Sequence, residues 1–405
     1  MLEVAGGTYL ELCGEPAWSE LYGSGVRAAA SLARLSRRVS LHTYIGKRER
    51  PTLDWLSSTF GFGIAAAENI NRTISFSYQH PLSEPVITPE VRKIELAAPL
   101  IVSGEAVVRF GFLEGDAVVH GRRVVYDPQS RYGPRPFHEN GSTAEKLAIV
   151  ANVAEASQLT GERVVAKMGR RLQRDERANV VVIKRGWRGA TVFHASAVMQ
   201  VPVYPTERVW SIGSGDVFTA VFGHFWAERS LAPRSAAVLA SQATAYYCAT
   251  RSLPVPRSPG LALAQLGSLP PRQPPSRKNP LLYLAGPFFT IAQRWLVTQS
   301  YNALLRQGIQ VFSPFHDVGV GPADKVVKAD LAALRRSTGV FAVIDGADPG
   351  TLFEVGFARA LGIPVVALVQ NESNEAVKML QGSDCVLLDD FASAIYRATW
   401  LATGT

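Results

Sequence analysis

Three carboxylates lie close together in the stretch VFAVIDGADPGTLFEVGFARALGIPVVAL (residues 340–368). Asp345 and Asp348 follow an apolar run that we expect to be a strand, and Glu354 follows a Pro-Gly turn, early in a predicted helix. The helix dipole favours the ionised form of a carboxylate in its first turns. Such a carboxylate can attack the anomeric carbon of a sugar, while a second carboxyl protonates the leaving group or holds the sugar hydroxyls. The pattern indicates cleavage of an N-glycosidic bond; the alternative is a set of acidic caps on a solvated loop.

A glycine-rich turn before an apolar helix, WSIGSGDVFTAVFGHFW (residues 210–226), is the second candidate site. Gly213, Ser214 and Gly215 are small, so backbone N–H groups there can approach an anion at the positive end of the helix. Asp216, at the helix start, is placed to accept a proton from a substrate hydroxyl. Phosphoryl transfer depends on such positioning and charge stabilisation. A capped helix after a tight turn is the alternative interpretation.

The elements around the three carboxylates predict a parallel α/β domain. Buried strands that alternate with crossover helices form a parallel sheet covered on both faces, and ligands bind at the carboxyl ends of its strands. The expected strands are 281–285, 309–312, 340–344, 364–369 and 385–388, and the expected helices are 291–306, 323–336, 351–361 and 374–380.

The composition is that of a globular protein with two or three domains. The chain has 405 residues, 47% hydrophobic and 19% charged, and no apolar run reaches the roughly 18–20 residues of a membrane helix. The N-terminus shows no secretory signal, and three well-separated cysteines fit a reducing cytoplasm. A net charge of +8 can attract anionic ligands, but no nucleic-acid module is recognisable. A proline-rich stretch predicts domains at 1–252 and 280–405 with a linker at 253–279.

Residues 281 to about 400 resemble the nucleoside 2-deoxyribosyltransferase family. YLAGPFF (residues 283–289) is similar to the family's opening strand and aromatic substrate loop, and Asp330 falls where the family places an aspartate before its third strand. DPGTLFEVGFA places Asp348 six residues before Glu354, which is the family spacing. The resemblance implies a flavodoxin-like, five-stranded parallel sheet with helices on both faces.

The same resemblance implies roles for residues. Glu354 would be the nucleophile, forming a covalent sugar intermediate that a second base or water resolves. Asp348 and Asp330 would bind the base or assist proton transfer, and Tyr283 would orient the glutamate. Some relatives hydrolyse nucleoside 5′-monophosphates, so the loop SPFHDVG (residues 313–319) could face a substrate phosphate or hydroxyl, or merely be solvated. The substrate-binding residues expected in this half are Tyr283, Gly286, Ser313, His316, Asp330 and Asp345.

Residues 4 to 256 resemble the ribokinase-like (PfkB) family of sugar and nucleoside kinases, an α/β sandwich. EVAGGTYLE is similar to its first strand, with Glu11 where the family has a sugar-binding aspartate. YGSGVRAAASLARLSRRVSLHTYIG is similar to its second glycine motif and first long helix, but Arg27 stands where the family has an asparagine that binds sugar hydroxyls. Arginine binds anions bidentately. Either the substrate carries a phosphate or carboxylate, or sugar binding is degraded.

The nucleotide side of the kinase family is matched as well. ANVAEASQLTG keeps the N-x-x-E pattern that the family associates with magnesium and phosphate, here Asn152 and Glu155. VVVIKRGWRGATVF, which contains Lys184 and Gly186, is similar to the strand and turn near the nucleotide. GSGD (residues 213–216) corresponds to the anion hole and catalytic base. The resemblance therefore implies ATP and Mg²⁺ as cofactors of this half, and no cofactor for the C-terminal half.

Together the two halves predict a bifunctional enzyme of nucleoside or nucleotide metabolism. One half would break or exchange an N-glycosidic bond, and the other would phosphorylate a sugar or nucleoside. The expected partners are small nucleosides, nucleotides or sugars, with no nucleic acid and no membrane, and we expect a homo-oligomer. One alternative is a nucleotide-sensing protein whose non-catalytic kinase-like half regulates the other half. Another is a glycohydrolase that acts on a nucleotide such as NAD.

Overall fold

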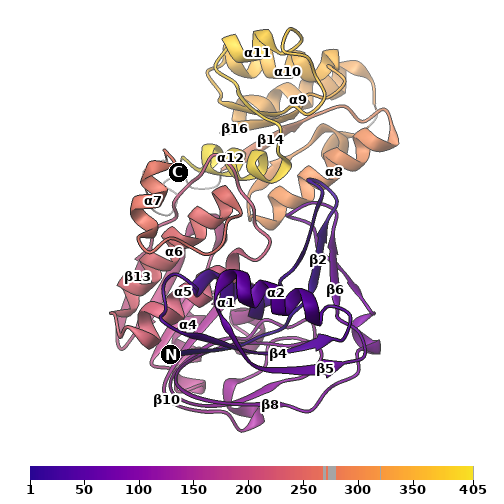
Figure 1. The fold of residues 1–405 in the computed structure, drawn as a ribbon. Coiled ribbons are helices and arrows are strands. Elements are labelled where there is room, and N and C mark those ends of the chain that lie inside the picture. Colours follow the sequence, from indigo (N-terminus) through magenta and orange to yellow (C-terminus); the bar gives the residue numbers. More distant parts are fainter. Residues whose placement is uncertain (268–270, 272–279, 320, 405) are drawn as a thin grey trace. The chain divides into compact units, whose positions relative to one another are not determined.

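The computed structural model describes residues 1–267, 271, 280–319 and 321–404. The chain divides into two compact units (Figure 1): the N-terminal unit comprises residues 1–206 and 210–273, and the C-terminal unit comprises residues 207–209 and 274–405. The first part of the expected linker contains helix α7 (Pro259–Gln265) and the buried side chain of Val255, which packs in the core of the N-terminal unit. Most of the remaining linker lies outside the described residues.

A nine-stranded sheet forms the centre of the N-terminal unit, in the order β13-β12-β11-β10-β9-β8-β1-β4-β5. The seven strands from β5 to β11 pair in parallel, and the β11-β12-β13 end is antiparallel. Their bounds are β1 (Leu2–Ala5), β4 (Val39–Gly46), β5 (Gly63–Ile70), β8 (Leu100–Phe110), β9 (Ala117–Asp127), β10 (Thr143–Asn152), β11 (Val180–Lys184), β12 (Ala190–His194) and β13 (Ala197–Val201).

Helices cover both faces of this sheet because successive strand residues point to opposite sides. Val108 on β8 belongs to the core beneath four helices, α1 (Gly23–Leu32), α2 (Arg50–Phe60), α5 (Ser214–Gly223) and α6 (Pro233–Thr250). Its neighbour Val107 belongs to the opposite core, beneath α3 (Val153–Thr160) and α4 (Val165–Asp175). The short helical turns of the unit are Val91–Lys93, Phe137–Asn140, Gly186–Arg188 and the π-helical turn His224–Glu228, which continues α5.

A separate four-stranded sheet, ordered β3-β2-β6-β7, also belongs to the N-terminal unit. Its strands are β2 (Leu10–Cys13), β3 (Trp18–Leu21), β6 (Ser75–Tyr78) and β7 (Val86–Thr88). The chain passes from β1 into this sheet through Gly6 and Gly7. A methyl group on Gly6 would lie 2.8 Å from the backbone nitrogen of Gly25. The glycines therefore let α1 pack directly against the end of β1.

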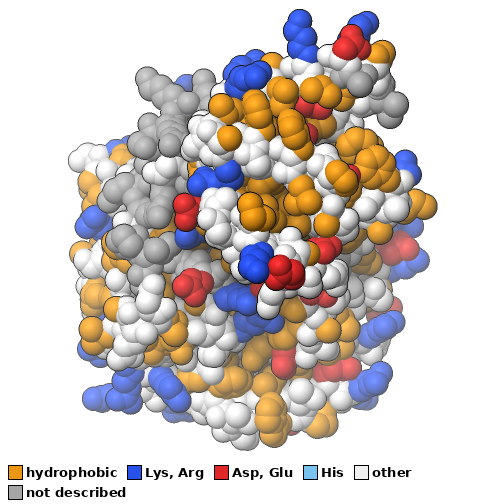
Figure 2. Space-filling view, turned by 90° about the horizontal axis from the view of Figure 1, so that it is seen from above, with side chains coloured by type: hydrophobic (Ala, Val, Ile, Leu, Met, Phe, Trp, Pro, Cys, Tyr) orange, Lys and Arg blue, Asp and Glu red, His pale blue; other side chains and the backbone are white. Residues whose placement is uncertain are grey.

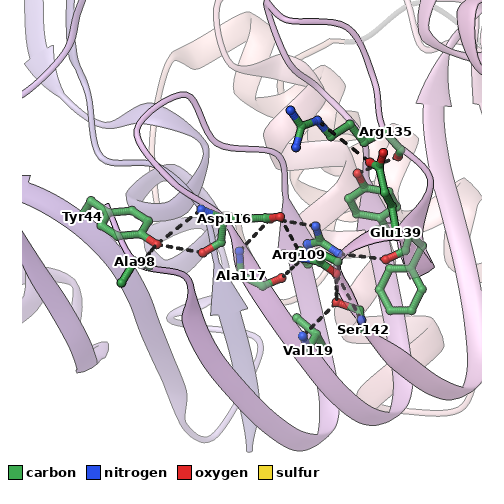
Figure 3. Close-up of polar contacts among 12 residues, drawn as sticks. Tyr44, Ala98, Arg109, Asp116, Ala117, Val119, Arg135, Glu139 and Ser142 are labelled. Atoms are coloured by element: carbon green, nitrogen blue, oxygen red, sulfur yellow. Dashed lines mark hydrogen bonds and ion pairs between the residues drawn. The ribbon is translucent and has the colours of Figure 1, made fainter. Parts of the chain in front are cut away.

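A buried arginine joins the loops that connect β8, β9 and β10 (Figure 3). Arg109 donates to Asp116 Oδ1 at 2.8 Å, to Ser142 Oγ at 3.1 Å and to the carbonyl of Phe137 at 3.2 Å. The hydroxyl of Tyr44, on β4, donates to the carbonyls of Ala98 and Asp116. Because Arg109 is bound by groups of the protein itself, we assign this network a structural role.

The C-terminal unit contains a five-stranded, all-parallel sheet in the order β15-β14-β16-β17-β18. The strands are β14 (Leu281–Ala285), β15 (Gln310–Phe312), β16 (Gly339–Val343), β17 (Val365–Leu368) and β18 (Val386–Leu388). The helices are α8 (Ile291–Arg306), α9 (Ala323–Arg336), α10 (Pro349–Ala360), α11 (Lys378–Gly382) and α12 (Phe391–Thr403), with a π-helical turn at Pro314–Val318.

The predicted fold class is confirmed for both units. The five expected strands of the C-terminal unit are all present, and α8 and α9 have the expected bounds. Two details differ. Helix α11 begins at Lys378 because Ser373 first forms a turn, its hydroxyl accepting from the amide of Ala376. Helix α12, which Asp390 caps, was not among the predicted helices. In the described part of the chain no helix is long and apolar enough to cross a bilayer.

Candidate functional site

Glu354 and Tyr283 meet at the carboxyl end of the C-terminal sheet. Tyr283 lies on β14 and is fully buried, whereas Glu354 lies on α10, which follows the neighbouring strand β16. The Tyr283 hydroxyl donates to Glu354 Oε1 at 2.6 Å. Burial raises the pKa of Glu354 to about 7, against the lowering effect of this hydrogen bond, and the charges of Asp330 and Asp348 raise it further. Burial and the Glu354 charge raise the pKa of Tyr283, so its hydroxyl keeps the proton that it donates.

The two other predicted carboxylates of this cluster are held differently. Asp348 is the N-cap of α10, and its Oδ2 accepts from the amide of Thr351 at 2.7 Å and from its hydroxyl at 2.8 Å. Asp330 projects from α9, and its Oδ1 is buried without a hydrogen-bond partner among the described residues. Burial raises the pKa of Asp330. Thus Asp348 has a structural role as well, while Asp330 offers an unused oxygen near Glu354.

The structure does not join Asp345 to this cluster by a hydrogen bond within the described residues. Its carboxylate accepts from the amides of Gln370 and Asn371, at 2.8 and 3.1 Å, and so connects the loop after β16 to the loop after β17. Close packing explains why residue 286 is a glycine. A Cβ there would lie 3.0 Å from Val297 on α8 and 3.2 Å from Val343 on β16.

Ser313 and His316 form a small cluster of their own after β15. His316 Nδ1 lies 2.9 Å from Ser313 Oγ, and the amide of Ser313 donates to Asp317 Oδ2 at 2.7 Å. The imidazole stacks on Tyr301, and burial lowers its pKa, which favours the neutral ring. Ser313 is fully buried. Ser313 therefore lies inside the loop, whereas His316 and Asp317 are exposed.

Aromatic rings lie near this loop. Motif spacing alone did not identify all of them as candidate site residues. Phe288, from the loop after β14, stacks on Phe289 and on Phe315, with ring centroids 5.3 and 5.5 Å apart. Tyr283 stacks on Phe312 of β15 at 5.6 Å. Stacked rings are suited to bind the flat face of a nucleobase. Phe312 and Phe315 were not among the predicted site residues, although Phe312 ends β15 and Phe315 lies in the turn that follows, a placement that gave a usable signal.

In the N-terminal unit, the predicted glycine turn lies at the start of α5. Gly213 is the N-cap with a φ of +74°, Ser214 and Gly215 begin the helix, and Asp216 is buried in its first turn. A Cβ on Gly215 would lie 3.4 Å from Lys184 Nζ, so the ammonium group reaches the same helix end. A positive helix end and a lysine together form a site suited to an anion.

Asp127, at the end of β9, was missed by the sequence reasoning. Its Oδ2 accepts from Lys184 Nζ at 2.6 Å and from the Thr219 hydroxyl at 2.7 Å. Its Oδ1 is buried without a hydrogen-bond partner in the described chain. Because β9, β10 and β11 are neighbouring parallel strands, their last residues, Asp127, Asn152 and Lys184, share one edge of the sheet. The position of Asp127 at a strand end, directly before a proline, was the available signal.

Asn152 and Glu155 form a capping box at the start of α3. Asn152 Oδ1 accepts from the amide of Glu155 at 2.9 Å, and Glu155 Oε2 accepts from the amide of Asn152 at 2.7 Å. Burial raises the pKa of Glu155 to about 7, the Asp127 charge raises it further and Lys184 opposes the rise. The next predicted residue, Gly186, opens a short turn with a φ of +56°.

Magnesium fits this edge only as a partner of phosphate. In the part of the chain that the structure describes, no group of three or more His, Cys, Asp or Glu side chains could hold a metal ion. Mg²⁺ is commonly held by one or two carboxylates together with substrate phosphates and water. The unpartnered Oδ1 of Asp127 and the nearby Glu155 satisfy that requirement.

Glu11 and Asp216 are joined by Arg27, which is fully buried. Arg27 Nη1 lies 3.1 Å from Glu11 Oε1 and 2.9 Å from Asp216 Oδ2, while Nη2 contacts Glu11 Oε2. Its Nε donates to the Tyr247 hydroxyl at 3.2 Å. Burial raises the pKa of Asp216 to about 6, although the Arg27 charge opposes the rise. The predicted sugar-binding position, the predicted base and the anomalous arginine therefore form one cluster, which Tyr247 completes.

Comparison with known proteins agrees with both resemblances. Residues 282–389 match the family model of nucleoside 2-deoxyribosyltransferase, and residues 146–256 match that of the pfkB family carbohydrate kinases. Each match shows a similarity of its own segment, and neither spans half of the chain. A search of curated proteins gives no match. The chain thus combines a kinase-like part with a deoxyribosyltransferase-like part, which supports a bifunctional enzyme of nucleoside or sugar metabolism.

Similar solved structures come from the ribokinase family. A ribokinase of Arabidopsis thaliana, complexed with ribose and ATP, is 17% identical; the match covers 65% of this chain and 98% of that chain, with a TM-score of 0.51. A fructokinase of Vibrio cholerae O395, with fructose, ADP and calcium bound, is 14% identical; the match covers 62% and 93%, with a TM-score of 0.46. Identities this low show the fold alone, and that fold is ribokinase-like.

Proposed function

We propose that the C-terminal half cleaves or exchanges the N-glycosidic bond of a nucleoside or nucleotide, with Glu354 as the nucleophile. The observation that carries this proposal is the 2.6 Å hydrogen bond from Tyr283 to Glu354 Oε1. It fixes the carboxylate at the carboxyl end of the sheet and leaves Oε2 to attack. Its donation also favours the ionised form that the attack needs.

The step balances with the residues present. Glu354 Oε2 forms a bond to the anomeric carbon while the carbon–nitrogen bond breaks, and the electron pair stays on the departing base. A protonated carboxyl near the base supplies the proton that this nitrogen takes up. Asp330 suits that role, because burial raises its pKa and its Oδ1 accepts no hydrogen bond from the described residues. Water or a second base then releases the sugar from Glu354.

The stacked rings of Phe288 and Phe315 support a nucleobase as the leaving group. The base, the sugar and its phosphorylation state are open, so the substrate test uses a panel. We would incubate the full-length protein with pooled nucleosides, nucleoside monophosphates and NAD, and detect released base by mass spectrometry. Glu354→Gln should abolish release from the substrate that the wild type cleaves. Unchanged release in Glu354→Gln would overturn the proposal, and release from NAD alone would assign a glycohydrolase.

For the N-terminal half, the family resemblance favours a phosphate-donor site at the start of α5. Backbone N–H groups of Ser214 and Gly215 and the Lys184 ammonium would bind the phosphates of ATP, and Asp127 with Glu155 would hold Mg²⁺. When bound, the nucleotide would supply the phosphoryl group. Transfer would require Asp216 to accept a proton from an acceptor hydroxyl. The pairing of Asp216 with Arg27 opposes that role and favours the alternative, a kinase-like half that binds nucleotide without transferring phosphate.

A further inference from the structure

We infer that the acceptor side of the N-terminal site is filled by the protein's own side chains, Arg27 and Tyr9, so that this half transfers no phosphate to a sugar or nucleoside. This inference deepens the second candidate function above and is independent of the chemistry at Glu354. It rests on the protein side chains that already form hydrogen bonds with the carboxylates to which an acceptor would bind.

Arg27 lies between the carboxylates of Glu11 and Asp216, in the place that an acceptor would take. Both oxygens of Glu11 and one oxygen of Asp216 contact its guanidinium, which has no exposed surface. A methyl group on Gly213 would overlap the guanidinium, so Arg27 packs directly against the turn that begins α5. A guanidinium has five N–H donors. Nε donates to Tyr247, the two N–H groups of Nη1 share the contacts with Glu11, Asp216 and the carbonyl of Gly23, and Nη2 contacts Glu11, so four of the five donors have a partner in the protein.

These contacts and the complete burial of the side chain argue against Arg27 as the binder of a substrate phosphate or carboxylate, which the sequence left as one explanation of the residue. Such a role needs a guanidinium with free donors and access to the ligand. Here four of the five donors contact groups of the protein and the side chain is closed off from solvent. Degraded acceptor binding is the explanation that the contacts support.

Tyr9 engages one oxygen of a further buried carboxylate, Glu114, whose Oε1 has no hydrogen-bond partner among the described residues. Its hydroxyl donates to Glu114 Oε2 at 2.8 Å, and both side chains are buried. The ring lies against Gly7, where a methyl group would overlap it, and also against Gly23, whose carbonyl accepts from Arg27. Tyr9 and Arg27 therefore meet across Gly23. Together they engage three buried carboxylates, Glu11, Asp216 and Glu114, and the first two are the ones that the family resemblance assigns to acceptor binding and proton abstraction.

Opening this site would leave charges buried without partners. If Arg27 moved out, Glu11 and Asp216 would remain buried side by side with no cation between them. An unpaired buried charge is strongly unfavourable, whereas a complete ion cluster or a neutral replacement is tolerated. The cluster is therefore expected to remain closed and to act as part of the core.

The experiment pairs a transfer assay with a stability assay on the full-length protein. The donors are ATP and pyrophosphate with Mg²⁺, and the acceptors are ribose, fructose, myo-inositol, adenosine and thymidine, with products followed by ³¹P NMR. The variants are Arg27→Met, Asp216→Asn, the neutral triple variant Glu11→Gln/Arg27→Met/Asp216→Asn, and Arg92→Met as a matched control at an exposed arginine. Thermal unfolding is recorded for each, and base release by the C-terminal half reports that half independently.

We expect no acceptor-dependent transfer by the wild type, a melting temperature several degrees lower in Arg27→Met, and recovery of at least half of that loss in the triple variant. Arg92→Met should unfold like the wild type. Transfer by the wild type that Asp216→Asn abolishes would overturn the inference. So would an Arg27→Met variant as stable as the wild type, because a buried ion cluster cannot lose its cation without cost. Base release bears only on the proposed function of the C-terminal half.

Discussion

Replacing Tyr283 by phenylalanine removes one hydrogen bond from the proposed nucleophile and little else. Tyr283 is fully buried and its ring stacks on Phe312, a contact that phenylalanine keeps. The lost hydroxyl is the group that donates to Glu354 Oε1 at 2.6 Å. Because that bond lowers the pKa of a carboxyl that burial raises to about 7, Tyr283→Phe should raise the pKa of Glu354 further.

The size of this effect follows from the strength of the bond. A hydrogen bond to a charged group contributes roughly 1.5–3 kcal/mol, and about 1.4 kcal/mol corresponds to a tenfold change in ionisation. The pKa of Glu354 should therefore rise by about one to two pH units. In the wild type Glu354 is about half ionised at pH 7. In Tyr283→Phe the ionised fraction of Glu354 at this pH should be roughly 5- to 50-fold smaller. The loss should shrink towards pH 9 and above, because the ionised form carries the reaction.

The assay is single-turnover release of base across pH 5–10, with the substrate that the panel identifies. The wild-type rate should rise with pH through a midpoint near the Glu354 pKa of about 7 and fall at higher pH, where Asp330 loses the proton that it donates. The midpoint of the rising limb in Tyr283→Phe should lie higher. Tyr301→Phe is the matched control, since that ring stacks on His316. An unchanged midpoint, or an equal loss at every pH, would refute the reasoning that Tyr283 tunes the ionisation of Glu354.

Three further results are expected. First, Glu354→Gln should stabilise the C-terminal unit by up to about 3 kcal/mol at pH 8 but hardly at pH 5. The folded-state pKa of Glu354 is raised from 4.5 to about 7, so stability is lost as pH rises through that window; an equal gain at both pH values in thermal unfolding would contradict this. Second, Asp330→Asn should slow base release at least about tenfold without lowering the melting temperature, because Oδ1 has no partner to lose among the described residues; a lower melting temperature with unchanged release would instead make Asp330 structural. Third, the full chain should self-associate at micromolar concentration in light scattering, since hydrophobic side chains gather on the face in Figure 2 and Phe289, Ile291 and Phe353 are exposed; a monomer would count against this.

Much of the C-terminal unit could be predicted because its information is local. Short apolar runs became strands and the spacing of polar residues marked α8 and α9, since a parallel strand buried on both faces must be apolar throughout its length. The position of Glu354 after a strand and a Pro-Gly turn is enough to assign it to the carboxyl end of the sheet. The contact of Glu354 with Tyr283, which lies 71 residues earlier, could not be predicted from local sequence. It exists because β14 pairs with β16.

In the N-terminal unit, the sequence predicted the motifs but not the contacts between them. The sequence by itself identified the glycine turn before Asp216 and the unusual arginine at position 27. It did not reveal that Arg27 contacts Asp216, 189 residues away, and Tyr247, 220 residues away. Nor did it mark Asp127 or the Tyr9–Glu114 pair as parts of the same region. Local patterns determine elements because helix and strand periodicity is a property of neighbouring residues. Whether a carboxylate is free to react depends on which distant side chain shares its buried space, and only tertiary packing decides that.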